Sequence, residues 1–110
     1  MTDRDRLLQR SPGAAGHPAI AAMVEQIRRV RSVERILLFG SRARGDHDER
    51  SDIDLAVACP AADAGDWAKI LLLVDDAPTL LTIDLVRLEH AGDALRQEIE
   101  QEGLVLYERG

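Results

Sequence analysis

The sequence predicts an α/β (α+β) fold, in which amphipathic helices alternate with short strands. Apolar residues recur every three or four positions in three segments, which is the spacing of one buried helix face. In two other segments they alternate with polar residues, which is the spacing of a strand with one buried face. A short apolar run, Ile36 to Phe39, ends at Gly40 and is typical of a buried strand followed by a tight turn.

The first helix is expected to begin at Pro18, because proline suits the first helical position. Its apolar stripe consists of Ile20, Met23, Val24, Ile27 and Val30. Residues 1–17 mix charged residues with glycine and proline, so we expect a flexible N-terminal leader there. Residues 18–110 are then expected to form a single domain.

Two strands are predicted to carry carboxylates on the face opposite their apolar residues. The apolar positions of the first strand are Ile53, Leu55 and Val57. Asp52 and Asp54 alternate with them, so both carboxylates fall on the other face. Residues 81–86 alternate in the same way and place Asp84 opposite the apolar side of a further strand.

The remaining elements complete the alternation of helices and strands. A helix over residues 63–74 is expected between the two carboxylate-bearing strands, with an apolar stripe of Trp67, Ile70, Leu71 and Val74. A third helix around Leu95 and Ile99 should end at Gly103, and residues 104–107 are expected to form a short closing strand.

The composition argues against several classes of protein, namely nucleic-acid-binding, disulfide-bonded and membrane proteins. With 14 Lys and Arg against 20 Asp and Glu, the net charge of −6 opposes general binding to nucleic acid or to an anionic membrane. Cys59 is the single cysteine, so no intrachain disulfide can form, and no apolar run has the length of a membrane span. We therefore expect a cytoplasmic protein. One domain of 110 residues leaves little room for a second substrate-binding lobe, so a partner chain and a hetero-oligomer are expected.

The pair Asp52 and Asp54 points to a metal site. Two carboxylates at this spacing on a strand project side by side and can share one or two hard cations such as Mg²⁺. At about 4 Å and an effective dielectric constant of about 20, their repulsion is about 4 kcal/mol, which a divalent cation would remove. The alternative is a solvated sheet edge without function. An EF-hand loop starting at Asp46 or Asp48 is excluded, because the required glycine and glutamate are absent.

The turn at Gly40 and Ser41 is a candidate phosphate site, because a turn after a buried strand exposes backbone N–H groups and a small hydroxyl. The alternative is an ordinary turn. The segment lacks the Gly-Lys-Ser/Thr end of a P-loop and the glycine spacing of a dinucleotide fold. Arg42 and Arg44 can both reach phosphate oxygens, and Arg42 is the preferred nucleotide-binding candidate because it directly follows the turn.

The combination of these features closely resembles the minimal nucleotidyltransferase family. Gly40 and Ser41 are followed by ten residues and then by Asp52-Ile53-Asp54-Leu55, and a separate strand carries Asp84. The similar segments are residues 40–45, 50–55, 82–86 and 99–107, within a resemblance that runs from about residue 20 to 108.

The resemblance implies the polymerase-β-like nucleotidyltransferase core, a small mixed β-sheet with helices on one face and the active site on the other. In that family Gly40 and Ser41 would hold the triphosphate of ATP, and Asp52 and Asp54 would bind two Mg²⁺ ions. Asp84 would complete the catalytic metal site and help to deprotonate the acceptor hydroxyl. Such a pair of cations flanks the attacking and leaving oxygens of an in-line displacement.

The resemblance also implies a reaction and a partner. This chain would transfer AMP from ATP to a protein, and the acceptor would be a tyrosine of a HEPN-domain ribonuclease toxin. The chain would then be the antitoxin of a toxin–antitoxin pair that acts by AMPylation. Two alternatives remain open at this point: a non-catalytic antitoxin that inhibits its partner by stoichiometric binding, and nucleotidyl transfer to a small molecule.

Overall fold

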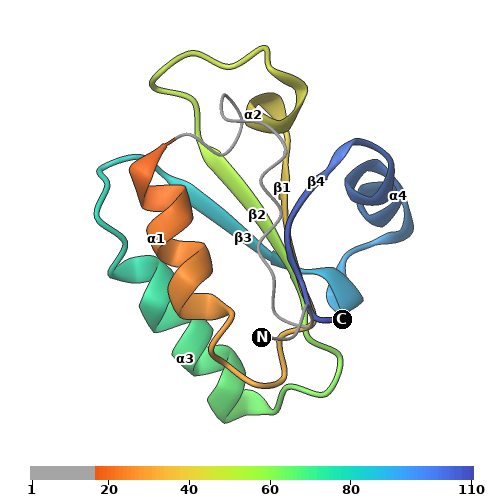
Figure 1. Cartoon of the computed structure of the whole chain (residues 1–110). Helices are drawn as coiled ribbons and strands as arrows, with labels where there is room; N and C mark the ends of the chain where they lie inside the picture. The colour runs from red at the N-terminus through yellow and green to blue at the C-terminus, as the bar shows by residue number, and fades with distance from the viewer. Residues whose placement is uncertain (1–16) are drawn as a thin grey trace.

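The computed structural model describes residues 17–110 (Figure 1). Its elements in chain order are α1 (Pro18–Ile27), β1 (Arg35–Phe39), α2 (Ser41–Arg44), β2 (Ile53–Ala58), α3 (Ala64–Asp75), β3 (Ile83–Arg87), the 3-10 helix η1 (Leu88–His90), α4 (Asp93–Glu102) and β4 (Leu104–Glu108). Apart from His17, the predicted leader over residues 1–17 lies outside the described residues. Among the described residues, no helix is both long enough and apolar enough to cross a membrane.

Helix α1 begins where the sequence predicted. Pro18 occupies the first turn, and His17 caps it, since its Nδ1 accepts a hydrogen bond from the Ala19 N–H at 3.1 Å. The helix ends at Ile27, one turn earlier than the predicted stripe. Val30 is nevertheless buried, in the turn that follows the helix, so the apolar pattern identified the core residues better than it identified the helix end.

The four strands form one mixed sheet in the order β3-β2-β1-β4. Strand β1 runs antiparallel to both β2 and β4, whereas β2 and β3 are parallel. A parallel pair needs a long crossover connection, and α3 supplies it. The predicted mixed-sheet fold is confirmed.

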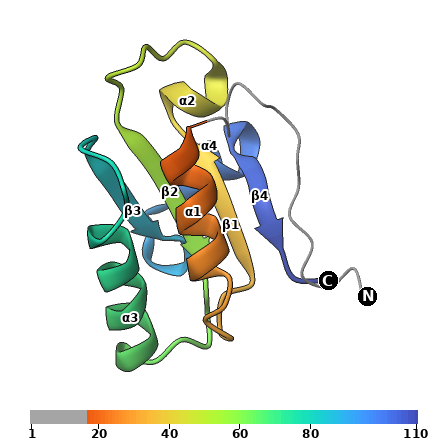
Figure 2. The same ribbon diagram turned by 60° about the vertical axis from the view of Figure 1, so that its left-hand side comes forward.

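Helices cover both faces of this sheet. Helices α1 and α3 lie on one face, as both ribbon views show (Figures 1 and 2), and their core includes Ile53, Leu55 and Val57 of β2. Helix α4 packs on the opposite face, where Ile99 joins a second cluster with Leu37, Phe39, Ala56, Ala58 and Leu88. The resemblance implied helices on one face only. The reason for the difference is that α4 carries its own apolar stripe, Leu95 and Ile99 at i and i+4, which must be buried.

Candidate active site

Two carboxylates meet on adjacent strands. In the parallel β2–β3 ladder Asp54 is the register partner of Asp84, and in the antiparallel β1–β2 ladder Asp54 is the partner of Phe39. Side chains of register partners stand next to each other on the same face of a sheet. Asp54 and Asp84 therefore lie side by side on the face that carries α4, opposite the core under α1 and α3.

The environment of Asp54 disfavours its charge. Partial burial, a hydrogen bond with Asp84, and the negative charges of Asp84 and Asp52 raise the pKa of Asp54 from 3.8 to about 6, while Arg44 opposes the rise. A hydrogen bond between two carboxyl groups requires a proton, so this contact favours the protonated form of Asp54. Without a cation, the pair thus holds a proton under conditions in which an ordinary aspartate has lost it.

Gly40 makes room for the Asp54 carboxylate. Its φ of +75° lies in a region that other residues rarely adopt, and a Cβ at this position would collide with Oδ2 of Asp54. The turn thus brings the end of β1 against the start of β2, with only a backbone atom beside the carboxylate. A glycine is required here both by the backbone conformation and by the close approach.

Ser41 follows directly and begins α2, a single helical turn whose N-cap is Gly40. The Gly40 carbonyl accepts from the N–H groups of Ala43 and Arg44, each at 3.1 Å. The N–H groups of the first turn of a helix have no acceptor within the helix, so they are suited to bind an anion. The N-terminus of α2 therefore lies next to the Asp54 carboxylate, beside the cavity.

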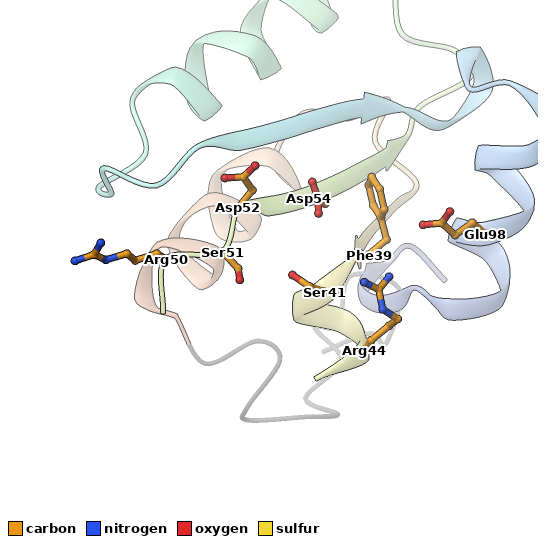
Figure 3. Close-up of a pocket in the computed structure, with 9 residues that line it drawn as sticks. Phe39, Ser41, Arg44, Arg50, Ser51, Asp52, Asp54 and Glu98 are labelled. Atoms are coloured by element: carbon orange, nitrogen blue, oxygen red, sulfur yellow. The ribbon is translucent and has the colours of Figure 1, made fainter. Parts of the chain in front are cut away.

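A cavity of about 570 Å³ opens at this point, and Figure 3 shows the side chains around it. It is lined by Phe39, Gly40, Ser41, Arg44, Arg50, Ser51, Asp52, Asp54 and Glu98. Five of the six predicted site residues are thereby placed: Gly40, Ser41, Asp52 and Asp54 line the cavity, and Asp84 lies beside Asp54 on β3.

Arg42 is placed differently from the prediction. Its side chain is only 4% exposed and donates to backbone carbonyls, with Nε 3.1 Å and Nη2 3.0 Å from the Ser51 oxygen. Weaker contacts of Nη2 reach the carbonyls of Asp48 and Glu49. The guanidinium forms its hydrogen bonds with the loop that leads to Asp52. Arg42 is the second residue of α2, and its side chain faces this loop and not the cavity. Arg42 therefore holds the loop and does not line the cavity beside Asp54.

Arg44, one half-turn further along α2, lines the cavity, which is the position that was expected for Arg42. Its guanidinium lies among the cavity residues in Figure 3 and forms ion pairs with Asp46 at 3.3 Å and Glu102 at 3.7 Å. Both pairs are exposed to solvent, so they hold the side chain only weakly. The sequence named Arg44 as able to reach phosphate but preferred Arg42, since the direction of a side chain on a short helix cannot be deduced without the fold.

Sequence reasoning did not identify Glu98, Arg50 and Phe39 as cavity residues. Glu98 comes from α4, nearly sixty residues after the glycine turn, and only the packing of α4 on this face brings it there. Arg50 and Phe39 flank the motif directly, and their adjacency to Ser51 and Gly40 was the available signal.

The donor set fits a divalent cation by its chemistry. Carboxylate oxygens are the ligands that Mg²⁺ prefers, and Asp54 and Asp84 are register partners on adjacent strands. Within residues 17–110, no group of three or more His, Cys, Asp or Glu side chains is already arranged around a metal position. Figure 3 shows why, because the carboxylate of Asp52 stands apart from that of Asp54. Asp54 and Asp84 form the prearranged part of the candidate metal site.

Comparisons with known proteins agree with this geometry. Residues 22–110 match the family model described as polymerase beta, nucleotidyltransferase. A protein of Methanocaldococcus jannaschii that carries the name protein adenylyltransferase MJ0141 is 42% identical over 48 residues, which cover 44% of this chain and 33% of that protein. The chain thus spans about a third of the length of that relative.

Solved structures show the same fold. A crystal structure of a toxin–antitoxin with AMP-PNP has a TM-score of 0.62 and 28% identity, covering 78% of this chain and 71% of the other. A structure of the MntA-HpeT toxin–antitoxin, in a variant with two aspartates two positions apart changed to glutamate, has a TM-score of 0.59 and 25% identity, covering 77% and 70%. The predicted enzyme class is that of the matched family. This chain belongs to the polymerase beta nucleotidyltransferase family.

Proposed function

We propose that this chain is a Mg²⁺-dependent adenylyltransferase that moves AMP from ATP to a protein, and that it acts as the antitoxin of a HEPN-domain ribonuclease toxin. The acceptor in this proposal is a tyrosine hydroxyl of the toxin. The observation that carries the proposal is the register of Asp54 with Asp84, with Gly40 packed against the Asp54 carboxylate. Asp54 lines the cavity together with Gly40 and Ser41, and Asp84 lies beside Asp54 on β3, which supports a metal-binding pair next to a phosphate-binding turn.

The similar proteins support the finer parts of the proposal. MJ0141 is named for protein adenylyl transfer, and one similar structure is a toxin–antitoxin with AMP-PNP. In the MntA-HpeT variant, the two exchanged aspartates have the spacing of Asp52 and Asp54 in this chain. These relatives motivate ATP as the nucleotide and a toxin as the partner.

The residues in and beside the cavity would have the following roles. Asp54, Asp84 and Asp52 would hold Mg²⁺, which neutralises charge on the attacking and leaving oxygens when it is bound. The turn at Ser41 and the Arg44 guanidinium would bind the phosphates of ATP. The acceptor oxygen would attack the α-phosphorus as the bond to pyrophosphate breaks, and the carboxylate of Asp84 would take the proton of the hydroxyl.

The test is to incubate the purified chain with the protein encoded beside it, which the proposal expects to be the toxin, together with ATP and Mg²⁺, and to measure the mass of that protein by mass spectrometry. We expect a mass gain of one or more AMP units on a tyrosine, abolished by EDTA and by Asp52→Ala with Asp54→Ala. Asp93→Ala, an exposed aspartate outside the cavity lining, is the matched control and should transfer normally. A toxin whose mass does not change would contradict the proposal.

Stoichiometric inhibition, the alternative from a different class, is distinguished with the same variants. If the double aspartate variant neutralises the ribonuclease as strongly as the unchanged chain, binding alone suffices and catalysis is not the mechanism. If neutralisation requires ATP and intact aspartates, the enzymatic proposal stands. Circular dichroism of each variant shows that a loss of effect is not a loss of fold.

A further inference from the structure

One carboxylate of the cavity has no role in the proposed metal site. Glu98 belongs to α4 and lines the cavity together with Asp54 and Phe39. Its side chain extends from α4 toward Phe39, with the carboxylate foremost (Figure 3). Within the part of the chain that the structure describes, this carboxylate forms no hydrogen bond and no ion pair, and the nearby Arg44 pairs with other acids. Glu98 is therefore free to bind a ligand.

Glu98 lies beyond one end of a row of residues that crosses the sheet. The register places Asp84 of β3, Asp54 of β2 and Phe39 of β1 in adjacent positions. Neighbouring strands are about 4.8 Å apart, so the row leads away from the two aspartates toward β1. Helix α4 packs against β1, where Ile99 shares an apolar cluster with Phe39. Phe39 therefore lies between Glu98 and the candidate metal pair, as Figure 3 shows for Asp54.

The charge of Glu98 restricts which part of a nucleotide can lie beside it. An ionised carboxylate only accepts hydrogen bonds, so the neighbouring ligand group must donate them. Phosphate oxygens cannot do so and would be repelled, whereas the ribose hydroxyls and the amino group of adenine are donors. The phosphates have other partners in the same cavity, namely the first turn of α2 at Ser41 and the Arg44 guanidinium.

Phe39 favours the sugar at this end of the cavity. Among the described residues that line the cavity, Phe39 alone has an apolar side chain, and the nucleoside is the least polar part of a nucleotide. The other end, at Arg50 and Asp52, offers charged side chains only. The ribose is bonded directly to the α-phosphate, which the proposed metal site at Asp54 would hold. Its hydroxyls are therefore the donors that can reach past Phe39 toward Glu98.

We propose that Glu98 accepts hydrogen bonds from the ribose hydroxyls of the bound nucleotide and makes the site selective for ribonucleotides over deoxyribonucleotides. This inference rests on the proposed function, because it deepens the nucleotide-binding role of the same cavity. An acidic side chain binds the ribose 2′-hydroxyl in the same way in dinucleotide-binding folds. A site that hydrogen-bonds a hydroxyl of its substrate rejects the analogue that lacks this group.

The experiment compares the binding of ATP, 2′-deoxy-ATP and inorganic tripolyphosphate by calorimetry, with Mg²⁺ and without a protein acceptor. The unchanged chain should bind ATP about tenfold more tightly than 2′-deoxy-ATP, as expected for a hydrogen bond to a charged group. Glu98→Ala should weaken ATP binding by about this factor or more and abolish the preference. It should not weaken the binding of tripolyphosphate, which has no ribose. Glu98 is exposed on a helix and alanine favours helices, so the fold should be unchanged, as circular dichroism will show.

Glu102→Ala is the matched control. Glu102 has the same charge, lies on the same helix and forms an ion pair with Arg44 at 3.7 Å, but it does not line the cavity. Any effect of this substitution passes through Arg44 and the phosphates, so it should change the affinities for ATP and 2′-deoxy-ATP by the same factor. The preference for the ribonucleotide should therefore remain.

The results separate this inference from the proposed function. The inference is overturned, while the proposed function stands, if the unchanged chain binds ATP and 2′-deoxy-ATP equally or if Glu98→Ala keeps the full preference. It is also overturned if Glu98→Ala binds ATP and tripolyphosphate more tightly by the same factor, because Glu98 would then act only by repelling phosphates. If the unchanged chain binds neither ATP nor tripolyphosphate, the proposed function is overturned as well.

Discussion

Replacing Asp54 by asparagine should stabilise the protein while removing its activity. The pKa of Asp54 is raised from 3.8 to about 6 by partial burial and by Asp84, so its ionisation opposes folding. The rise corresponds to about 3 kcal/mol at about 1.4 kcal/mol per pH unit. Because Asp54 is partly exposed and solvent screens its charge, we expect about 1–2 kcal/mol of this to be recovered.

The sign of the pH dependence follows from the direction of the pKa shift. A group whose pKa is raised by folding contributes its full stability below pH 3.8 and loses it as the pH rises through about 6. An asparagine side chain cannot ionise, so the Asp54→Asn variant should equal the unchanged chain near pH 4 and exceed it above pH 7. At pH 8 its Tm should be higher by about 4–16 °C, given about 4–8 °C per kcal/mol for a small domain.

The assay is thermal unfolding in EDTA, followed by circular dichroism from pH 4 to pH 8. Asp93→Asn is the matched control, because Asp93 is exposed and is not among the groups that shift the pKa of Asp54. Adding Mg²⁺ should narrow the difference, since a cation that binds the native carboxylates stabilises the unchanged chain. Equal Tm values at pH 8, or a difference that is the same at pH 4 and pH 8, would refute the argument that ionised Asp54 is destabilising.

Three other substitutions and treatments test the site and the fold. Gly40→Ala should abolish transfer and lower the free energy of unfolding by about 2–3 kcal/mol. Gly45→Ala, at φ +88° with open space around it, should lower the free energy of unfolding by only about 1 kcal/mol and leave the site intact. Thermal unfolding and transfer assays measure both effects. Arg42→Met should destabilise the protein by about 2–3 kcal/mol and expose the loop before Asp52 to protease. Arg42→Lys should not restore this stability, because an ammonium group cannot form the two-pronged contact that the guanidinium makes with the Ser51 carbonyl. The Cys59 thiol is buried and its pKa is raised by that burial, so iodoacetamide at pH 7.5 should leave the native protein unmodified and label it once after unfolding, as mass spectrometry can count.

The order of strands and helices could be deduced from the sequence because each segment has a clear period. The alternation around Asp54 and the run before Gly40 each identified a strand within one residue of its observed start. Helix α3 begins after Asp63, whose side chain accepts from the Asp66 N–H at 2.8 Å, as expected for a residue in the capping position. These features are local, and local physics determines them.

The contents of the cavity could be deduced only in part, because they depend on contacts between distant segments. The pairing of Asp54 with Asp84 requires the β2–β3 register, and no single strand specifies that register. Glu98 reaches the cavity through the packing of α4, which buries Ile99 against a face that was expected to lack helices. The motif predicted candidate site residues, and the fold places Glu98, Arg50 and Phe39 beside them.

At Arg42, a local sequence pattern and contacts within the fold act together in one short segment. The ten residues between Ser41 and Asp52 connect the turn at Gly40 to strand β2, and both ends of this loop line one cavity. A loop of this length has many conformations, and fixing it costs about 1–2 kcal/mol per residue in backbone entropy. The buried Arg42 guanidinium offsets part of this cost by donating hydrogen bonds to the carbonyls of Ser51, Asp48 and Glu49. The arginine next to the glycine turn thus acts on the site through the loop, because its hydrogen bond to the Ser51 carbonyl fixes the backbone directly before Asp52 and β2.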